Sequence, residues 1–149
     1  MNLVDGEIIW IKNHGIPLKS KMKVFNDRIY LLNQDNRIIS LDINNGSIIW
    51  SLRLISSFIK SQSFLSSALS KDGDLIISTS SGDLLNLDSL SGEMRWSLNT
   101  LGSLLAHATD FFESSDIVIS GESIIFSKKS KIFSFNLNSG SSNWENDVN

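Results

Sequence analysis

The residues able to do chemistry are few and lie far apart in this 149-residue chain. His14 and His107 have no second ligand-type residue at metal-binding spacing. The serines at 66–67 and 80–81 offer hydroxyl groups, but no base accompanies them in the pattern of a serine hydrolase. The absence of cysteine excludes a thiol nucleophile, a Cys-based zinc site and a disulfide framework. The sequence therefore predicts no catalytic residue, no cofactor and no metal ligand.

The acidic and amide residues are better explained by turns than by chemistry. Residues 72–74 read Asp-Gly-Asp, a hairpin turn that lacks the remaining ligands of a calcium loop. Asp42, Asp88 and Asn136 occupy equivalent places at the ends of apolar runs, where we expect them to accept hydrogen bonds from nearby backbone N–H groups. Residues spread in this way, one per unit, cannot all converge on one site.

Composition excludes several classes of protein. The net charge of -3 and the pI of about 5.3 leave no basic surface for nucleic acid. No stretch reaches about 18 consecutive apolar residues, so we expect no transmembrane segment. The first seven residues lack the basic region and apolar core of a signal peptide. The length and the 41% hydrophobic content predict one globular domain.

An internal repeat organises the whole chain. A tryptophan recurs at intervals of roughly 40–50 residues, which is the period of propeller blades. Each tryptophan follows a glycine by four residues, and the pairs are Gly6 and Trp10, Gly46 and Trp50, Gly92 and Trp96, and Gly140 and Trp144. The glycine predicts a backbone position with positive φ in a hairpin that carries a bulge.

Between these marks, short apolar or alternating runs are separated by turn residues. They predict three four-stranded antiparallel units at 18–53, 62–99 and 115–147, with 6–12 as an orphan fourth strand whose own sheet is missing. Runs such as residues 75–77 are apolar throughout, as in a strand covered on both faces. The predicted fold is therefore all-β, an open arc of a larger β-propeller over residues 1–149.

Two other folds fit less well. A β-sandwich also has many short strands, but it does not predict the same Gly-x-x-x-Trp mark at every fourth strand. The best helix candidate, residues 101–112, lacks a sustained 3.6-residue period. One aromatic in every unit indicates packing between neighbouring units rather than a functional aromatic site, because a site seldom needs the same residue in each repeat.

The repeated Leu-Asp-x-x-x-Gly-x-x-x-Trp of residues 41–50 and 87–96 resembles the PQQ-like propeller repeat. The third unit departs from it with Asn136, and no threonine precedes any of the four glycines. Within this superfamily, segments 64–76 and 124–130 are most similar to BamB-like proteins, the lipoproteins of the outer-membrane β-barrel assembly machinery. The resemblance implies an eight-bladed, non-enzymatic scaffold on the periplasmic side of the outer membrane, with a BamA-type protein partner.

Two alternatives remain open within the same superfamily. A PQQ-dependent dehydrogenase would hold a calcium-bound quinone at the propeller axis, often above a vicinal cysteine pair that this chain lacks. A sensor propeller would bind a peptide or another ligand. The flanking coding sequence would discriminate, since a lipobox cysteine favours a BamB-like protein and a vicinal cysteine pair in a longer chain favours a dehydrogenase.

The connections between units are long and apolar for loops. Loops carry function more often than the scaffold, and exposed apolar patches mark interaction sites. The connections in this chain therefore predict a protein-docking rim, formed by Arg53, Leu54, Ile55, Phe58, Leu104 and Leu105. Arg53 is the expected anchor, because arginine is enriched in binding hot spots. The alternative is that these residues begin the inner strands or cover the blade tops.

Overall fold

The computed structural model describes residues 4–54, 65–79, 83–99, 116–128 and 130–148. Strands and turns, without any helix, make up this described part of the chain. The strands are β1 (Lys23–Phe25), β2 (Arg28–Leu32), β3 (Arg37–Asp42), β4 (Ile48–Arg53), β5 (Ser67–Leu69), β6 (Asp74–Ser78), β7 (Asp83–Asp88), β8 (Met94–Asn99), β9 (Val118–Ser120), β10 (Ser123–Lys128), β11 (Lys131–Asn136) and β12 (Ser142–Asp147). The helix candidate at 101–112 lies outside the described residues.

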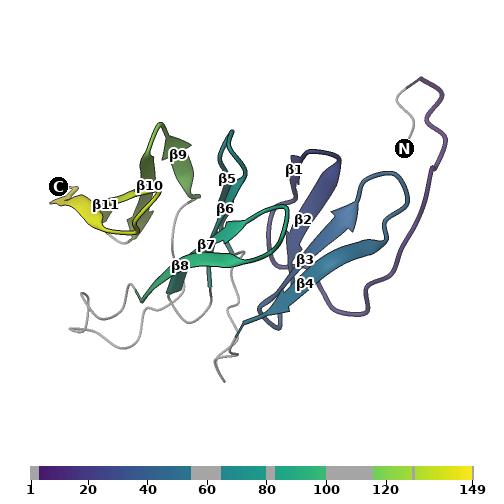
Figure 1. Cartoon of the computed structure of the whole chain (residues 1–149), viewed down its shortest axis with the longest axis horizontal. Helices are drawn as coiled ribbons and strands as arrows, with labels where there is room; N and C mark the ends of the chain where they lie inside the picture. Colours follow the sequence, from purple (N-terminus) through teal and green to yellow (C-terminus); the bar gives the residue numbers. More distant parts are fainter. Residues whose placement is uncertain (1–3, 55–64, 80–82, 100–115, 129, 149) are drawn as a thin grey trace.

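Consecutive strands pair antiparallel into three separate four-stranded sheets, in the orders β1-β2-β3-β4, β5-β6-β7-β8 and β9-β10-β11-β12. Figure 1 shows the three sheets side by side in an open arc rather than a closed ring. This arrangement confirms the all-β, open propeller predicted from the repeat. We call the sheets blade 1, blade 2 and blade 3 in chain order.

The turn between the third and fourth strands is built in the same way in all three blades. The glycines of these turns, Gly46, Gly92 and Gly140, have φ of 67°, 78° and 71°. Each glycine N–H donates to the carbonyl of the residue four positions before it. A β-bulge follows in each hairpin, where the register shifts within the third strand. Glycine fits because only it adopts this left-handed conformation without a steric penalty.

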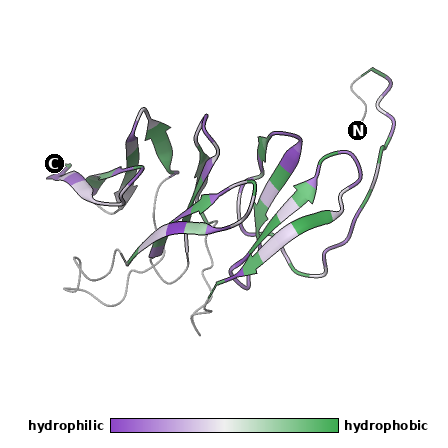
Figure 2. Cartoon of the chain, viewed as in Figure 1, coloured by the Kyte–Doolittle hydropathy of each residue, from purple (hydrophilic) through white to green (hydrophobic). Residues whose placement is uncertain are grey.

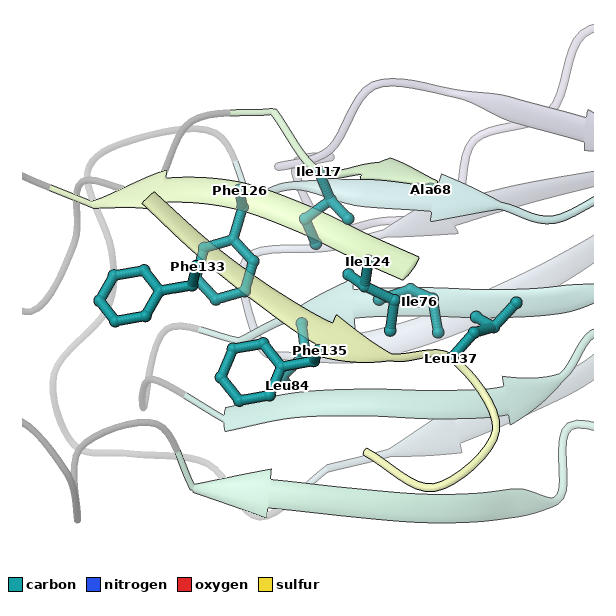
Figure 3. Close-up of a cluster of buried hydrophobic side chains, with 9 residues drawn as sticks. All are labelled: Ala68, Ile76, Leu84, Ile117, Ile124, Phe126, Phe133, Phe135 and Leu137. Carbon is teal, nitrogen blue, oxygen red and sulfur yellow. The ribbon is translucent and has the colours of Figure 1, made fainter. Parts of the chain in front are cut away.

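The core lies between the blades rather than within one of them. Blades 1 and 2 enclose one apolar cluster, which contains Tyr30, Leu32, Ile38, Leu65, Leu75, Ile77 and Leu87. Blades 2 and 3 enclose a second (Figure 3), which contains Ala68, Ile76, Leu84, Ile117, Ile124, Phe126, Phe133, Phe135 and Leu137. Because β2 and β6 are covered on both faces, their buried residues follow one another without alternation. Figure 2 shows hydrophobic residues, in green, in all three sheets.

A third apolar cluster lies on the face of blade 1 that points away from blade 2. Ile29, Leu31, Ile39 and Leu41 are buried there, with Trp10 packed against them. Residues 6–12, expected as an orphan strand, pair with no sheet and belong to the segment that runs along the end of the arc (Figure 1). A strand needs a ladder of hydrogen bonds to a neighbour, so this segment is held by its tryptophan instead.

Candidate functional site

Three of the four tryptophans make the same contact with a turn in the next blade along the chain. In each case the indole Nε1–H donates to the backbone carbonyl three residues before a turn glycine. The bonds are Trp10 to Ile43 at 2.8 Å, Trp50 to Ser89 at 3.0 Å and Trp96 to Leu137 at 2.9 Å. This geometry explains the repeat period, since each of these three indoles needs one turn in the next blade along the chain.

The turn glycines are required by the indoles as well as by the backbone. A Cβ built on Gly46 would lie 2.7 Å from the ring of Trp10. The same atom on Gly92 would lie 2.8 Å from Trp50, and on Gly140 it would lie 3.0 Å from Trp96. Any larger residue would push the indole out of its seat. We call this unit of indole, glycine and carbonyl the tryptophan seat.

The remaining two repeat marks have no such contact in the described part of the chain. Trp144 lies opposite Ser134, the register position that Trp50 and Trp96 hold in their blades, but its side chain is 43% exposed. A Cβ built on Gly6 would meet nothing within 4 Å. Within the described residues, Gly6 and Trp144 therefore take part in no tryptophan seat.

A charged network that the sequence did not reveal lies at one end of blade 2. The carboxylate of Asp74 is buried and accepts hydrogen bonds from Ser70 Oγ at 2.9 Å and Arg95 Nη1 at 2.7 Å. Arg95 Nη2 also donates to Asp88 Oδ2 at 2.8 Å. The guanidinium thus bridges β6 to the turn before β8. These contacts of Asp74, Asp88 and Arg95 tie the three strands β6, β7 and β8 together at this end of the blade.

The carboxyl of Asp88 has its pKa lowered to about 2. The main cause is the backbone N–H of Ser91, followed by the hydrogen bond from Arg95. The same contact with Asp88 raises the pKa of the Arg95 guanidinium. Asp88 therefore stays ionised and holds its turn, which is the role that the sequence predicted for it.

The network continues across the boundary between blades 2 and 3. Asn86 Nδ2 donates to Asp74 Oδ1 at 3.3 Å and to the carbonyl of Leu137 at 3.0 Å. That carbonyl is the one that Trp96 uses, so a single backbone oxygen receives two donors from blade 2. No sequence pattern pointed to Asp74 and Arg95 as partners, because their contact depends on the register of β6, β7 and β8.

The predicted docking rim is only partly described. Arg53 ends β4 with its side chain exposed, whereas Leu54 is half-buried and packs against the cluster between blades 1 and 2. Arg53 lies directly opposite Arg37 in the β3–β4 pairing, and Arg37 Nη2 donates to Ser51 Oγ at 2.7 Å. The other members of the predicted rim, Ile55, Phe58, Leu104 and Leu105, lie outside the described residues.

The other candidates from the sequence are accounted for in turns and loops. Asp42 Oδ1 accepts from the backbone N–H of Asn44, and Asn136 Oδ1 accepts from those of Asn138 and Ser139. His14 is half-buried with its Nε2 unbonded among the described residues, and His107 lies outside them.

Two searches of the described residues were negative. They hold no group of three or more His, Cys, Asp or Glu side chains that could bind a metal ion. No helix within them is long and apolar enough to cross a membrane.

Comparison with solved structures supports the propeller architecture. BamB from Moraxella catarrhalis matches with a TM-score of 0.71 and 18% identity, over 95% of this chain and 40% of that one. A europium-containing methanol dehydrogenase matches at 0.68 and 15%, over 95% and 27%. The quinohemoprotein alcohol dehydrogenase of Comamonas testosteroni matches at 0.66 and 15%, over 89% and 21%. At these identities the likeness shows the fold alone.

The sequence comparisons are more specific. A search of curated proteins found no match. The family model described as outer membrane protein assembly factor BamB matches residues 1–149, which is the entire chain. The chain spans 40% of the length of the solved BamB structure. The repeated tryptophan seats and the open arc of three blades are consistent with this family match. The chain belongs to the BamB family of PQQ-like propellers.

Proposed function

We propose that this chain is a non-catalytic interaction scaffold that assists the assembly of outer-membrane β-barrel proteins from the periplasmic side. The observation that carries the proposal is the family match over residues 1–149. The structure supports it because most of the repeated residues hold blades and turns together. Six of the eight repeat marks hold blades together in tryptophan seats, and Asp88 and Asn136 hold turns.

The rim at the ends of β3 and β4 is the surface that we assign to the partner. Arg37 and Arg53 lie opposite each other, and like charges at such positions destabilise a sheet. Neither guanidinium forms an ion pair with an acidic side chain among the described residues. A carboxylate on a partner protein would relieve this repulsion and would gain a charge-assisted hydrogen bond. We therefore propose that the partner, which the family match suggests is a BamA-type component, presents an acidic segment to this surface.

The dehydrogenase alternative rests on the blade fold that this chain shares with such enzymes. The matches to two alcohol-oxidising enzymes are 15% identical, and they cover 27% and 21% of those chains. At these identities the matches show a shared fold alone.

The test is a binding measurement between the purified protein and the periplasmic domains of the barrel-assembly component. Arg53→Glu reverses one charge of the rim and should weaken binding by at least about 10-fold, as for a hot-spot arginine. Lys71→Glu is the matched control, because Lys71 is exposed in the turn before β6, at the opposite end of a blade. Equal affinities of wild type and Arg53→Glu would refute the rim, and no binding by wild type would refute the partner.

A further inference from the structure

The residue before each repeat glycine has the same structural role in all four repeats. Its side-chain oxygen accepts a hydrogen bond from the backbone N–H two residues further along the chain. The acceptors are Asp5 Oδ1 at 2.9 Å, Asn45 Oδ1 at 2.8 Å, Ser91 Oγ at 3.2 Å and Ser139 Oγ at 3.2 Å. A carboxylate, an amide and a hydroxyl group all serve. The turn therefore needs an oxygen at this position, and it has no need of the amide nitrogen of Asn45.

Asn45 is the only asparagine of the chain that is followed by glycine. The backbone nitrogen of Gly46 is the next main-chain nitrogen after the Asn45 side chain, and glycine has no side chain to shield it. The Ser47 N–H holds the Asn45 amide folded back along the turn and polarises its carbonyl group. This pair therefore has the composition and the local geometry that favour attack of a backbone nitrogen on a side-chain amide.

The solvent exposure of Asn45 belongs to the turn and not to the ends of the chain. Asn45 and its counterparts Ser91 and Ser139 are all exposed. Blade 2 packs against a blade on each of its faces, and Ser91 is exposed there too. Water therefore reaches this position in a sheet that is flanked on both sides.

We infer that Asn45 is a site of spontaneous deamidation in the folded protein. The Gly46 nitrogen attacks Cγ of Asn45, so that a new N–Cγ bond forms and the Cγ–Nδ2 bond breaks. Nδ2 leaves as ammonia with the proton from the Gly46 nitrogen, and a cyclic succinimide remains. Solvent water then adds to one of the two ring carbonyls and gives either aspartate or isoaspartate. The Gly46 N–H must first leave the Asp42 carbonyl, to which it donates at 2.9 Å, so the rate follows the opening of this turn.

The two products differ in their effect on the Trp10 seat. Aspartate keeps the backbone length and supplies the same acceptor, as Asp5 does in its own turn. Isoaspartate routes the backbone through the former side chain and adds one methylene group before Gly46. That glycine is packed closely against the indole, since a Cβ built on it would lie 2.7 Å from the Trp10 ring. The Ile43 carbonyl that accepts from Trp10 Nε1 belongs to the same turn. Isoaspartate therefore loosens the joint between Trp10 and blade 1.

The test is peptide mapping by mass spectrometry of the folded full chain during incubation at mildly alkaline pH. Asn45 should deamidate several-fold faster than Asn44 and Asn138, which are exposed in turns of the same kind but are not followed by glycine. Ser91→Asn builds a second Asn-Gly pair in the blade 2 turn, and deamidation should appear there as well. Asn45→Ser is the matched control, because serine holds this position in blades 2 and 3, and it should remove the modification from blade 1.

Limited digestion with trypsin measures the effect on the seat. Lys12 lies beside Trp10, and its Cγ would be 2.9 Å from a Cβ built on Gly46, so cleavage after Lys12 reports release of this segment. Cleavage should become several-fold faster in aged wild type, in step with the isoaspartate content. It should stay unchanged in equally aged Asn45→Ser. Asn45→Asp has the charge of the product without the added methylene group, and it should be cut at the rate of fresh wild type.

Three results would overturn the inference. An intact Asn45 in the folded chain, under conditions in which the urea-unfolded chain deamidates there, would show that the bond from Gly46 to Asp42 protects the amide. Deamidation of Asn45 no faster than that of Asn138 would show that the glycine has no effect in this turn. Unchanged cleavage after Lys12 once isoaspartate has accumulated would show that the seat tolerates the longer backbone.

Discussion

Replacing Trp50 with alanine measures directly what one tryptophan seat contributes to stability. Trp50 packs against the cluster between blades 1 and 2, and its ring centroid lies 6.1 Å from that of Tyr30. Its Nε1–H donates to the carbonyl of Ser89 at 3.0 Å. Removing a buried tryptophan costs about 3–5 kcal/mol, and Trp50 is only half-buried. The hydrogen bond contributes about 1 kcal/mol of that and the aromatic pair a similar amount. We therefore expect a loss of about 3 kcal/mol.

The assay is urea denaturation at low protein concentration, followed by circular dichroism. Trp144→Ala is the internal control, because Trp144 holds the same register position without a seat, and it should cost less than about 1 kcal/mol. Trp50→Phe should fall between the two, since it keeps apolar area and loses the bond to Ser89. Equal losses for Trp50→Ala and Trp144→Ala would refute the seat as the source of stability.

Four further outcomes follow from the same structure. Gly92→Ala should cost at least about 2 kcal/mol by urea denaturation, against about 1 for Gly121→Ala, because both have positive φ but only Gly92 faces an indole. The Asp88 carboxylate stabilises the fold fully above its unfolded pKa near 3.8, and this stabilisation, about 1–2 kcal/mol after screening, is lost as pH falls through about 2. A pH series of thermal midpoints should show this loss in wild type and not in Asp88→Asn. Arg95→Met should cost about 3 kcal/mol by leaving Asp74 buried and unpaired, and adding Asp74→Asn should recover part of it. The isolated chain should be marginally stable and aggregate on heating, because strand edges and blade faces are uncovered; a reversible, cooperative monomeric transition would contradict this.

The blades could be predicted from sequence because a few residues determine their period. Trp50 and Trp96 each need a glycine turn one blade further on, and such a turn permits only a narrow choice of residue. The strand pattern follows from burial, since β2 and β6 are apolar on both faces. These signals are local or strictly periodic, so they can be recognised in the sequence without the three-dimensional structure.

The contacts that depend on register could not be predicted. Asp74, Asp88 and Arg95 meet because β6, β7 and β8 align at one end of blade 2, and no spacing rule identifies that alignment. The opposition of Arg37 and Arg53 has the same origin in the β3–β4 pairing. The sequence predicts Leu54 as part of a rim, and the structure shows it half-buried and packed against the cluster between blades 1 and 2. An apolar residue after a strand looks the same in sequence whether it faces solvent or the next sheet.

The acceptors in the three tryptophan seats are all backbone carbonyls. They belong to Ile43, Ser89 and Leu137, so the same bond forms whether the residue is aliphatic or a serine. The joint between blades therefore recognises the shape of a turn rather than the identity of the residue that forms it. A gene built on such joints can lengthen, shorten or shuffle by whole repeats without inventing a new contact each time, and chimeras cut between repeats should inherit their joints intact.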